Sequence, residues 1–248
     1  MTRVRVIPLL SGMLRRDKST FVMGAPSQPF DVPVIMFLVR TAEANILVDT
    51  GIRDPKETPP IHGSYEHTAE HRPLALLRRH GLGPDDIDIV INTHLHWDHC
   101  SNNGLFEKAT FYVQRTEIAY AVAPLPPHAH GYEAFELGLV PPFAGTKFEV
   151  LDGDGQITKE VSVFLTPGHT PGFQSVLVRS GGLACLLAGD NIPTHENLRG
   201  NTISDFTPST IYVNLEDYYR SIRRILSFGV PIVPGHEIAL IGRKNLLS

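Results

Sequence analysis

The sequence has few cysteines, no long apolar run and little net charge, and each shortage excludes a class of protein. Cys100 and Cys185 are its only cysteines, so it is no disulfide scaffold, and a reducing, cytoplasmic compartment fits. No run approaches the roughly 18 apolar residues of a membrane span, and we expect no signal peptide. The net charge of −4 predicts neither nucleic acid nor an anionic membrane as a partner.

What the chain does contain is enough apolar sequence for a core, and many histidines. Hydrophobic residues make up 42% of the chain, which is normal for a globular protein. No internal repeat or low-complexity linker divides the 248 residues, and this length suits a single α/β domain over residues 1–248. The 12 histidines are a high number for this length, and their positions decide what they do.

Short apolar runs bounded by turn residues predict many strands and few helices. We expect strands over 4–10, 33–40, 45–48, 86–92, 110–113, 147–151, 160–165, 173–178, 183–188 and 230–233, and helices over 73–80, 115–122 and 215–228. The segment 124–144 is interpreted as a loop or lid that shapes a pocket, with a short helix over 132–137. This pattern favours two packed sheets flanked by helices over a regular βαβ alternation.

The densest chemical signal is the run Thr93-His94-Leu95-His96-Trp97-Asp98-His99. His94 and His96 follow a strand two residues apart, so on extended backbone both imidazoles point to one side and can bind one ion. Asp98 and His99 come next and can serve a second ion. Imidazole and carboxylate suit a cation such as zinc. The alternative, a polar surface turn, would require an improbable coincidence of four ligand-type side chains.

Three later segments each place a ligand-type residue beside glycine at the end of a strand. They contain His169 in Thr-Pro-Gly-His-Thr-Pro-Gly, Asp190 in Ala-Gly-Asp, and His236 in Val-Pro-Gly-His. A single Gly-His step is weak evidence, but three such sites after the dense run are hard to dismiss. Seven candidate ligands exceed the needs of one tetrahedral zinc and suit two ions that share a carboxylate and hold a bridging hydroxide.

With these residues in place, the chain resembles the metallo-β-lactamase superfamily. Its H-x-H-x-D-H motif is similar to His94–His99, the later order of His169, Asp190 and His236 agrees, and Asp49-Thr50-Gly51 matches the family's N-terminal turn. The resemblance implies an αββα sandwich, of α/β (α+β) class, in which two mixed sheets lie face to face with helices outside. It places the site at one edge.

The same resemblance implies a role for each matching residue. His94, His96 and His169 would hold one metal ion, Asp98, His99 and His236 the other, and Asp190 would bridge the two. The ions would be zinc in the first instance, with iron, manganese or cobalt as alternatives. Asp49 would orient a ligand histidine from behind, although an ordinary turn aspartate is the other interpretation.

Within the superfamily, the chain looks most like N-acyl-homoserine lactone lactonases and related small lactonases. The segment Thr166 to Ser175 is similar to their Thr-Pro-Gly-His-Ser-Pro-Gly-His-Gln-Ser run, and Trp97 stands where they commonly have Phe. The resemblance implies opening of a lactone ring by the bridging hydroxide, with Asp98 shuttling a proton and Trp97 against the substrate. We expect a small lactone or ester as substrate, and a monomer or homodimer.

One departure from the family concerns the substrate. The family usually has a tyrosine three residues after the bridging aspartate, where this chain has Pro193. His195 and Tyr212 are the candidates to replace it as a catalytic donor. His195 is also interpreted as a plain surface histidine.

Other functions remain open on the sequence. A metallo-β-lactamase-fold hydrolase of another ester, a thioester, a β-lactam or a phosphoester is the main alternative. An iron-dependent persulfide dioxygenase is a further one, whereas diiron proteins usually carry Glu where His96 stands. A non-catalytic binding protein would not need the complete ligand set. The remaining histidines, His62, His67, His71, His128 and His130, are interpreted chiefly as loop residues in solvent.

Overall fold

Two β-sheets stack face to face in the computed structural model, which describes residues 4–200, 202 and 204–247. The seven-stranded sheet runs in the order β4-β1-β2-β3-β5-β6-β7. Its strands are β1 (Arg5–Asp17), β2 (Pro29–Arg40), β3 (Asn45–Val48), β4 (Tyr65–Glu66), β5 (Ile89–Ile91), β6 (Thr110–Gln114) and β7 (Phe148–Leu151). The five-stranded sheet runs β12-β11-β10-β9-β8. Its strands are β8 (Gly155–Gln156), β9 (Val161–Leu165), β10 (Gln174–Ser180), β11 (Leu183–Gly189) and β12 (Ile232–Pro234).

Both sheets mix parallel and antiparallel pairs, as the resemblance implied. In the larger sheet β1, β2 and β3 pair antiparallel, and β3, β5, β6 and β7 pair parallel. In the smaller sheet only the β11–β12 pair is parallel. Parallel pairing aligns the carboxyl ends of β3 and β5 at one edge, and those of β11 and β12 likewise.

The main core lies between the sheets. Val6, Phe37 and Ile91 of the larger sheet pack in one buried cluster with Val176 and Leu187 of the smaller sheet. The intervening residues of the same strands form a second apolar layer on the outer face of the larger sheet. Because side chains alternate along a strand and both faces are buried, the strands appear in the sequence as continuous apolar runs.

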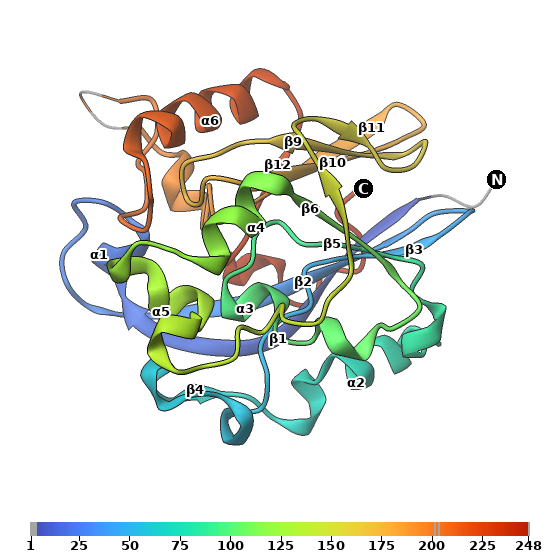
Figure 1. The fold of residues 1–248 in the computed structure, drawn as a ribbon. Helices are drawn as coiled ribbons and strands as arrows, with labels where there is room; N and C mark the ends of the chain where they lie inside the picture. The colour runs from blue at the N-terminus through green and yellow to red at the C-terminus, as the bar shows by residue number, and fades with distance from the viewer. Residues whose placement is uncertain (1–3, 201, 203, 248) are drawn as a thin grey trace.

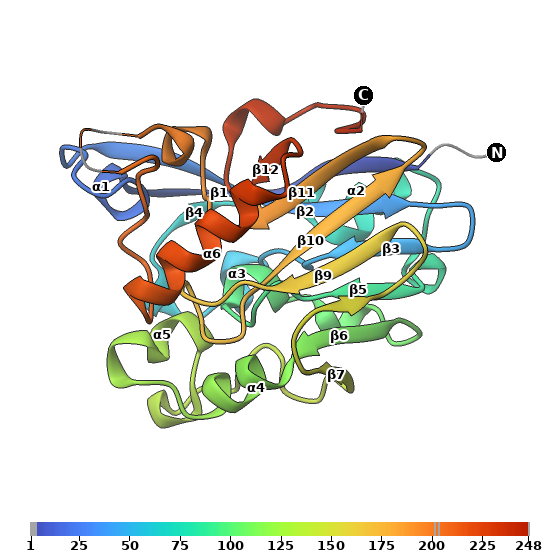
Figure 2. The same ribbon diagram turned by 90° about the horizontal axis from the view of Figure 1, so that it is seen from above.

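Helices cover the outer faces (Figures 1 and 2). The helix α6 (Leu215–Ser227) buries Tyr218, Ile222 and Ile225 against the smaller sheet, at the spacing of one helical face. The helix α2 (Pro73–Arg78) buries Leu76 and Leu77 against the larger sheet. The other helices are α1 (Lys18–Phe21), α3 (Trp97–Cys100), α4 (Arg115–Val122) and α5 (Ala129–Tyr132). The predicted αββα sandwich is confirmed.

The structure contains the predicted elements, but the ends of several are shifted and it has some short elements that were not predicted. The first strand was expected to end at residue 10 but continues to Asp17 past an irregularity between Leu10 and Gly12. Its partner β2 likewise begins at Pro29 instead of residue 33. The expected helix over 132–137 is instead α5 followed by a 3-10 turn at Phe135–Leu137. The very short β4, β8, α1 and α3 were not predicted, because elements of two to four residues carry no periodicity.

Two further expectations can be compared with the structure. Cys100 and Cys185 are both buried and free, and a reducing compartment stays a prediction. None of the helices in the described ranges combines the length and the apolar character needed to cross a bilayer.

Candidate metal centre

The seven candidate ligands come together at one edge of the two sheets. His94 and His96 follow β5, and Asp98 and His99 lie in α3, which begins directly after His96. His169, Asp190 and His236 follow β9, β11 and β12 of the other sheet. Gly235 makes this convergence possible, because a Cβ at that position would lie 2.7 Å from the carbonyl carbon of Gly189. The loops that carry Asp190 and His236 therefore touch backbone to backbone.

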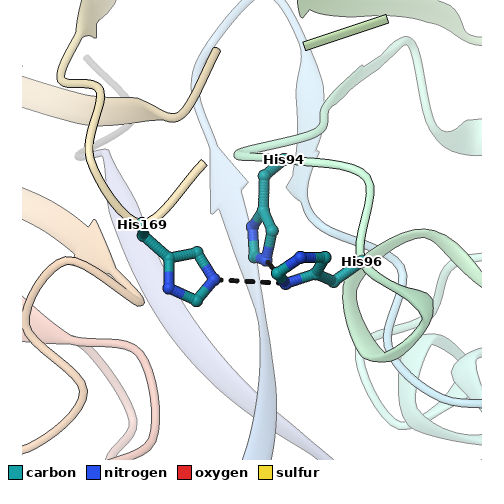
Figure 3. Close-up of side chains that lie close together, drawn as sticks. All are labelled: His94, His96 and His169. Carbon is teal, nitrogen blue, oxygen red and sulfur yellow. Dashed lines mark hydrogen bonds between the residues drawn. The ribbon is translucent and has the colours of Figure 1, made fainter. Parts of the chain in front are cut away.

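The first group is formed by His94, His96 and His169, whose side chains point toward one another (Figure 3). The Nδ1 atom of His96 lies 3.0 Å from Nε2 of His94 and 3.2 Å from Nε2 of His169. All three rings are buried or nearly so. Three imidazole nitrogens facing one point are the ligand set of a zinc-type ion.

The second group is formed by Asp98, His99 and His236, and Asp190 lies between the two groups. Oδ1 of Asp190 is 3.2 Å from Nε2 of His99 and 3.1 Å from Nε2 of His236. Its Oδ2 is 3.4 Å from Nε2 of His169, in the first group. One carboxylate therefore faces both groups, as a bridging ligand must.

The residues present fit bound cations, and two buried atoms support this. Nε2 of His99 and Oδ1 of Asp190 are buried with no hydrogen-bond partner among the described residues. Leaving a buried polar atom unpaired costs about 1–3 kcal/mol, so a protein keeps such atoms only where something else satisfies them. A cation between an imidazole lone pair and a carboxylate oxygen would satisfy both.

The rear nitrogen of each of four histidines is fixed by a hydrogen bond. Nδ1 of His99 donates to Asp49 at 2.8 Å, Nδ1 of His169 to the carbonyl of Ile211 at 2.9 Å, and Nδ1 of His236 to the carbonyl of Pro33 at 2.8 Å. Nδ1 of His94 lies 3.0 Å from the Thr93 hydroxyl, which itself donates to Asp49. Because each Nδ1 is occupied by its hydrogen bond, Nε2 is the nitrogen that each ring turns toward the ligand group.

The pKa shifts separate the two groups. Burial lowers the pKa of His94 and His96 well below the usual value, and lowers that of His169. These rings stay neutral and ready to bind a cation. Burial also acts to lower the pKa of His99 and His236, but the neighbouring carboxylates, Asp190 foremost and then Asp98, outweigh it and both pKa values rise. A metal ion entering the second group would therefore displace protons.

No pattern in the sequence indicated Glu117, which holds two of the ligand loops together. This residue of α4 is fully buried, and burial raises its pKa although four donors surround its carboxyl group. It accepts the backbone N–H of Leu95 at 3.0 Å, between the first two ligand histidines. On the other side it accepts the hydroxyl of Thr170 at 2.6 Å and the N–H of Gly172 at 3.1 Å, just after His169.

A cavity of about 490 Å³ opens above the ligands. His96, Asp98, His169, Asp190 and His236 form its metal-facing end. The other lining residues, from several loops and from the end of β1, are Leu14, Arg16, Thr20, Phe21, Ile61, His62, Trp97, His128, His130, Gly131, Thr210, Ile211, Tyr212 and Val213. The cavity is large enough for a small organic molecule.

Trp97 forms part of the cavity wall, and a buried ionic network fixes its neighbour His62. The His62 ring stacks on Trp97 with centroids 3.9 Å apart, and its Nε2 lies 3.0 Å from Glu133. Arg53 binds the same carboxylate at 2.5 Å. The interpretation of His62 as a loop residue in solvent was therefore wrong, because only 6% of its surface is exposed.

The two candidates for the missing tyrosine lie in different places. Tyr212 lines the cavity, and its segment is clamped to the ligand loop by the N–H of Val213, which donates to the carbonyl of Gly168 at 2.8 Å. The His195 side chain is 48% exposed, pairs with Glu237 at 2.9 Å and does not line this cavity. The carbonyl of Pro193 accepts the N–H of His236 at 2.7 Å.

Comparisons with known proteins agree with this geometry. The Metallo-beta-lactamase superfamily profile matches residues 30–236. The chain is 30% identical to an N-acyl homoserine lactonase, AttM, of Azorhizobium caulinodans, over 96% of this chain and 94% of that protein. It is 29% identical to an N-acyl homoserine lactonase of Bacillus thuringiensis, over 86% and 84%. A solved N-acyl homoserine lactone hydrolase, with the product N-hexanoyl-L-homoserine at its catalytic metal centre, superimposes with a TM-score of 0.78 at 27% identity. That match covers 96% of this chain and 95% of the other.

Proposed function

Because the chain belongs to the Metallo-beta-lactamase superfamily, we propose that it is a metal-dependent hydrolase that opens the ring of a lactone, with N-acyl-homoserine lactones as the substrate class. The observation that carries this proposal is the pair of ligand groups joined by Asp190 beneath a cavity of about 490 Å³. Similarity to N-acyl homoserine lactonases over most of the chain supports the choice of substrate.

The first ion would be held by His94, His96 and His169, and the second by Asp98, His99 and His236, with Asp190 serving both. Nitrogen-rich ligand groups with carboxylates favour zinc, and iron, manganese or cobalt are the alternatives. When bound, two such ions supply a hydroxide nucleophile near neutral pH and polarise the substrate carbonyl.

The chain's own residues orient the substrate and move the proton. The carboxylate of Asp98 faces the cavity, where it can take a proton from the nucleophile and deliver it to the ring oxygen as the ester bond breaks. We propose Tyr212, which lines the same cavity, as the hydroxyl that donates to the carbonyl oxygen in place of the family tyrosine. Trp97 offers an aromatic wall to the rest of the substrate.

The test is a hydrolysis panel with metal-reconstituted protein. Homoserine lactones of several acyl lengths are compared with aromatic lactones, thioesters, β-lactams and phosphotriesters. We expect turnover of lactones, its loss on chelation, and its loss in His94→Ala. The matched control is His80→Ala, which removes a histidine outside the ligand groups. Turnover of only a non-lactone substrate, or full lactone turnover by verified metal-free protein, would contradict the proposal.

Metal content distinguishes the proposal from an iron-dependent dioxygenase. Two complete ligand groups predict two ions per chain, whereas a mononuclear oxygenase would hold one iron. Elemental analysis of the reconstituted protein gives this ratio directly. One iron per chain together with oxygen consumption would favour the dioxygenase.

A further inference from the structure

One cation lies in the wall of the cavity without an acidic partner. Arg16, near the end of β1, lines the cavity beside Leu14. No ion pair of the described residues includes it. Arg16 also precedes residues 30–236, the region that the family profile matches.

The charge of the cavity makes this cation unusual. Its acidic lining residues are Asp98 and Asp190, and both belong to the ligand groups. Bound divalent cations would engage those carboxylates, and no other acid in the lining offsets Arg16. With those carboxylates engaged by ions, Arg16 would leave the cavity cationic in a chain whose net charge is −4. A concave, low-dielectric site lined by charge of one sign concentrates ligands that carry the opposite charge.

The guanidinium group is also held in place. Its Nη1 donates to the carbonyl of Arg15 at 3.0 Å, and its Nη2 donates to the carbonyl of His62 at 3.0 Å. His62 is itself a rigid anchor, because its ring stacks on Trp97 and binds Glu133. A guanidinium carries five N–H donors, so donors remain beyond these two bonds. An arginine fixed in this way is suited to the paired oxygens of a carboxylate.

We propose that the cavity selects a lactone that carries a carboxylate on its side chain, with the lactone ring at the ligand groups and the carboxylate at Arg16. This inference rests on the proposed lactonase function and narrows its substrate class. Ring opening joins the oxygen of water to the acyl carbon, breaks the ring C–O bond and leaves the proton on the released ring oxygen. The product is then a hydroxy dicarboxylate, with one carboxylate from the ring and one already present.

The experiment compares two N-acyl-homoserine lactones of equal chain length, one ending in a carboxylate and the other in a methyl group. The measured quantity is the kcat/KM of the lactone that ends in a carboxylate, divided by the kcat/KM of the lactone that ends in a methyl group. Losses of folding or metal loading affect both values and cancel in this ratio. We expect a ratio above one for the unaltered protein. In Arg16→Met and Arg16→Gln the ratio should fall about tenfold or more, chiefly through KM, and Arg16→Lys should keep part of it.

Arg15→Met is the matched control, because Arg15 neighbours Arg16 on the same strand but is exposed and does not line the cavity. Its ratio should equal that of the unaltered protein. Binding can be followed separately by fluorescence, since Trp97 is the chain's one tryptophan and lines the cavity. The ring-opened dicarboxylate should bind more weakly to Arg16→Met than to Arg15→Met.

The outcomes separate this inference from the function on which it rests. Turnover of both lactones with an unchanged ratio in Arg16→Met overturns the carboxylate preference alone. An equal loss for both lactones in that variant also overturns it, since the ratio is then unchanged. Failure of the metal-loaded protein to open either lactone overturns the proposed function, and the inference with it.

Discussion

Asp49 shows how a single side chain sets the chemistry of the ligand group. Its carboxylate accepts from Nδ1 of His99, from the hydroxyl of Thr93 and from the N–H of Thr93, all at 2.7–2.8 Å. Its backbone has a positive φ of 62°, a conformation that Asp and Asn tolerate better than most residues. Asparagine therefore changes the carboxylate while sparing the backbone.

We expect Asp49→Asn to weaken metal binding about 10–100-fold. The amide presents an N–H where an acceptor stood, which disfavours the His99 tautomer that leaves Nε2 free to bind a cation. Competition with a chromophoric chelator measures the affinity. Asp85→Asn, which removes an exposed carboxylate paired with Lys108, serves as control. Equal affinities in the two variants would show that Asp49 is only a turn residue.

At this scale the sequence predicted the candidate ligands but not the residues that support them. His94 to His99 could be found because four ligand-type residues lie within six positions. Glu117, His62 and Arg16 could not, because each acts through contacts with residues distant in the chain, such as Thr170, Trp97 or a cavity wall. Single residues of common types carry no pattern of their own, and only the fold shows what they face.

Among the elements, the segment 124–144 was predicted as a loop or lid, and the structure shows how it is attached. Glu133 follows α5 with a positive φ of 49° and is 1% exposed. It binds Arg53 and His62 from a distant part of the chain. Burial acts to raise the Glu133 pKa, but hydrogen bonds from His62 and Arg53 outweigh it and lower the pKa. The ion pairs thus fasten the segment to the wall that contains Trp97.

We expect Glu133→Gln to reduce the free energy of unfolding by about 1–3 kcal/mol at pH 7. Because the folded pKa of Glu133 is lowered, its stabilising effect is complete above the unfolded pKa, about 4.3, and is lost as pH falls through the folded value. The difference between the two proteins should therefore shrink below about pH 4. Urea unfolding between pH 3 and 7 measures it.

The control for this prediction is Glu136→Gln, an exposed carboxylate three residues further along the same segment. It should leave the free energy of unfolding within about 0.5 kcal/mol of the unaltered protein. A Glu133→Gln deficit that stays constant down to pH 3 would contradict the ionic explanation and indicate a packing effect instead.

For the whole molecule, the architecture was predictable because both faces of each central strand are buried. Val6 and Phe37 face one apolar layer while Ile7 and Leu38 face the other, so the runs are apolar throughout and stand out. The ends of the long strands were less predictable. Beyond Leu10, the register with β2 shifts at Ser11, and β1 continues through Gly12, Arg15 and Arg16, which interrupt the apolar run that made the strand visible.

The candidate ligands come from both sheets, so bound ions would join the two halves of the sandwich. His94, His96, Asp98 and His99 follow a strand of the larger sheet, and His169, Asp190 and His236 follow strands of the smaller one. An ion bound across them interacts with the folded state but finds no assembled group in the unfolded chain. Metal binding should therefore stabilise the whole fold and not only a loop.

We expect zinc at about 100 times its dissociation constant to stabilise the metal-free protein by about 2.7 kcal/mol. For a chain of this size that raises Tm by roughly 5–10 °C, measurable by calorimetry with and without zinc. His236→Ala removes a ligand from the second group only. Zinc should raise the Tm of this variant less, because the histidines of the first group remain. Cys185→Ala, which changes a buried residue outside both groups, should keep the full rise even if its own Tm is lower. An identical Tm with and without zinc in the unaltered protein would mean that the groups hold no ion in the folded state.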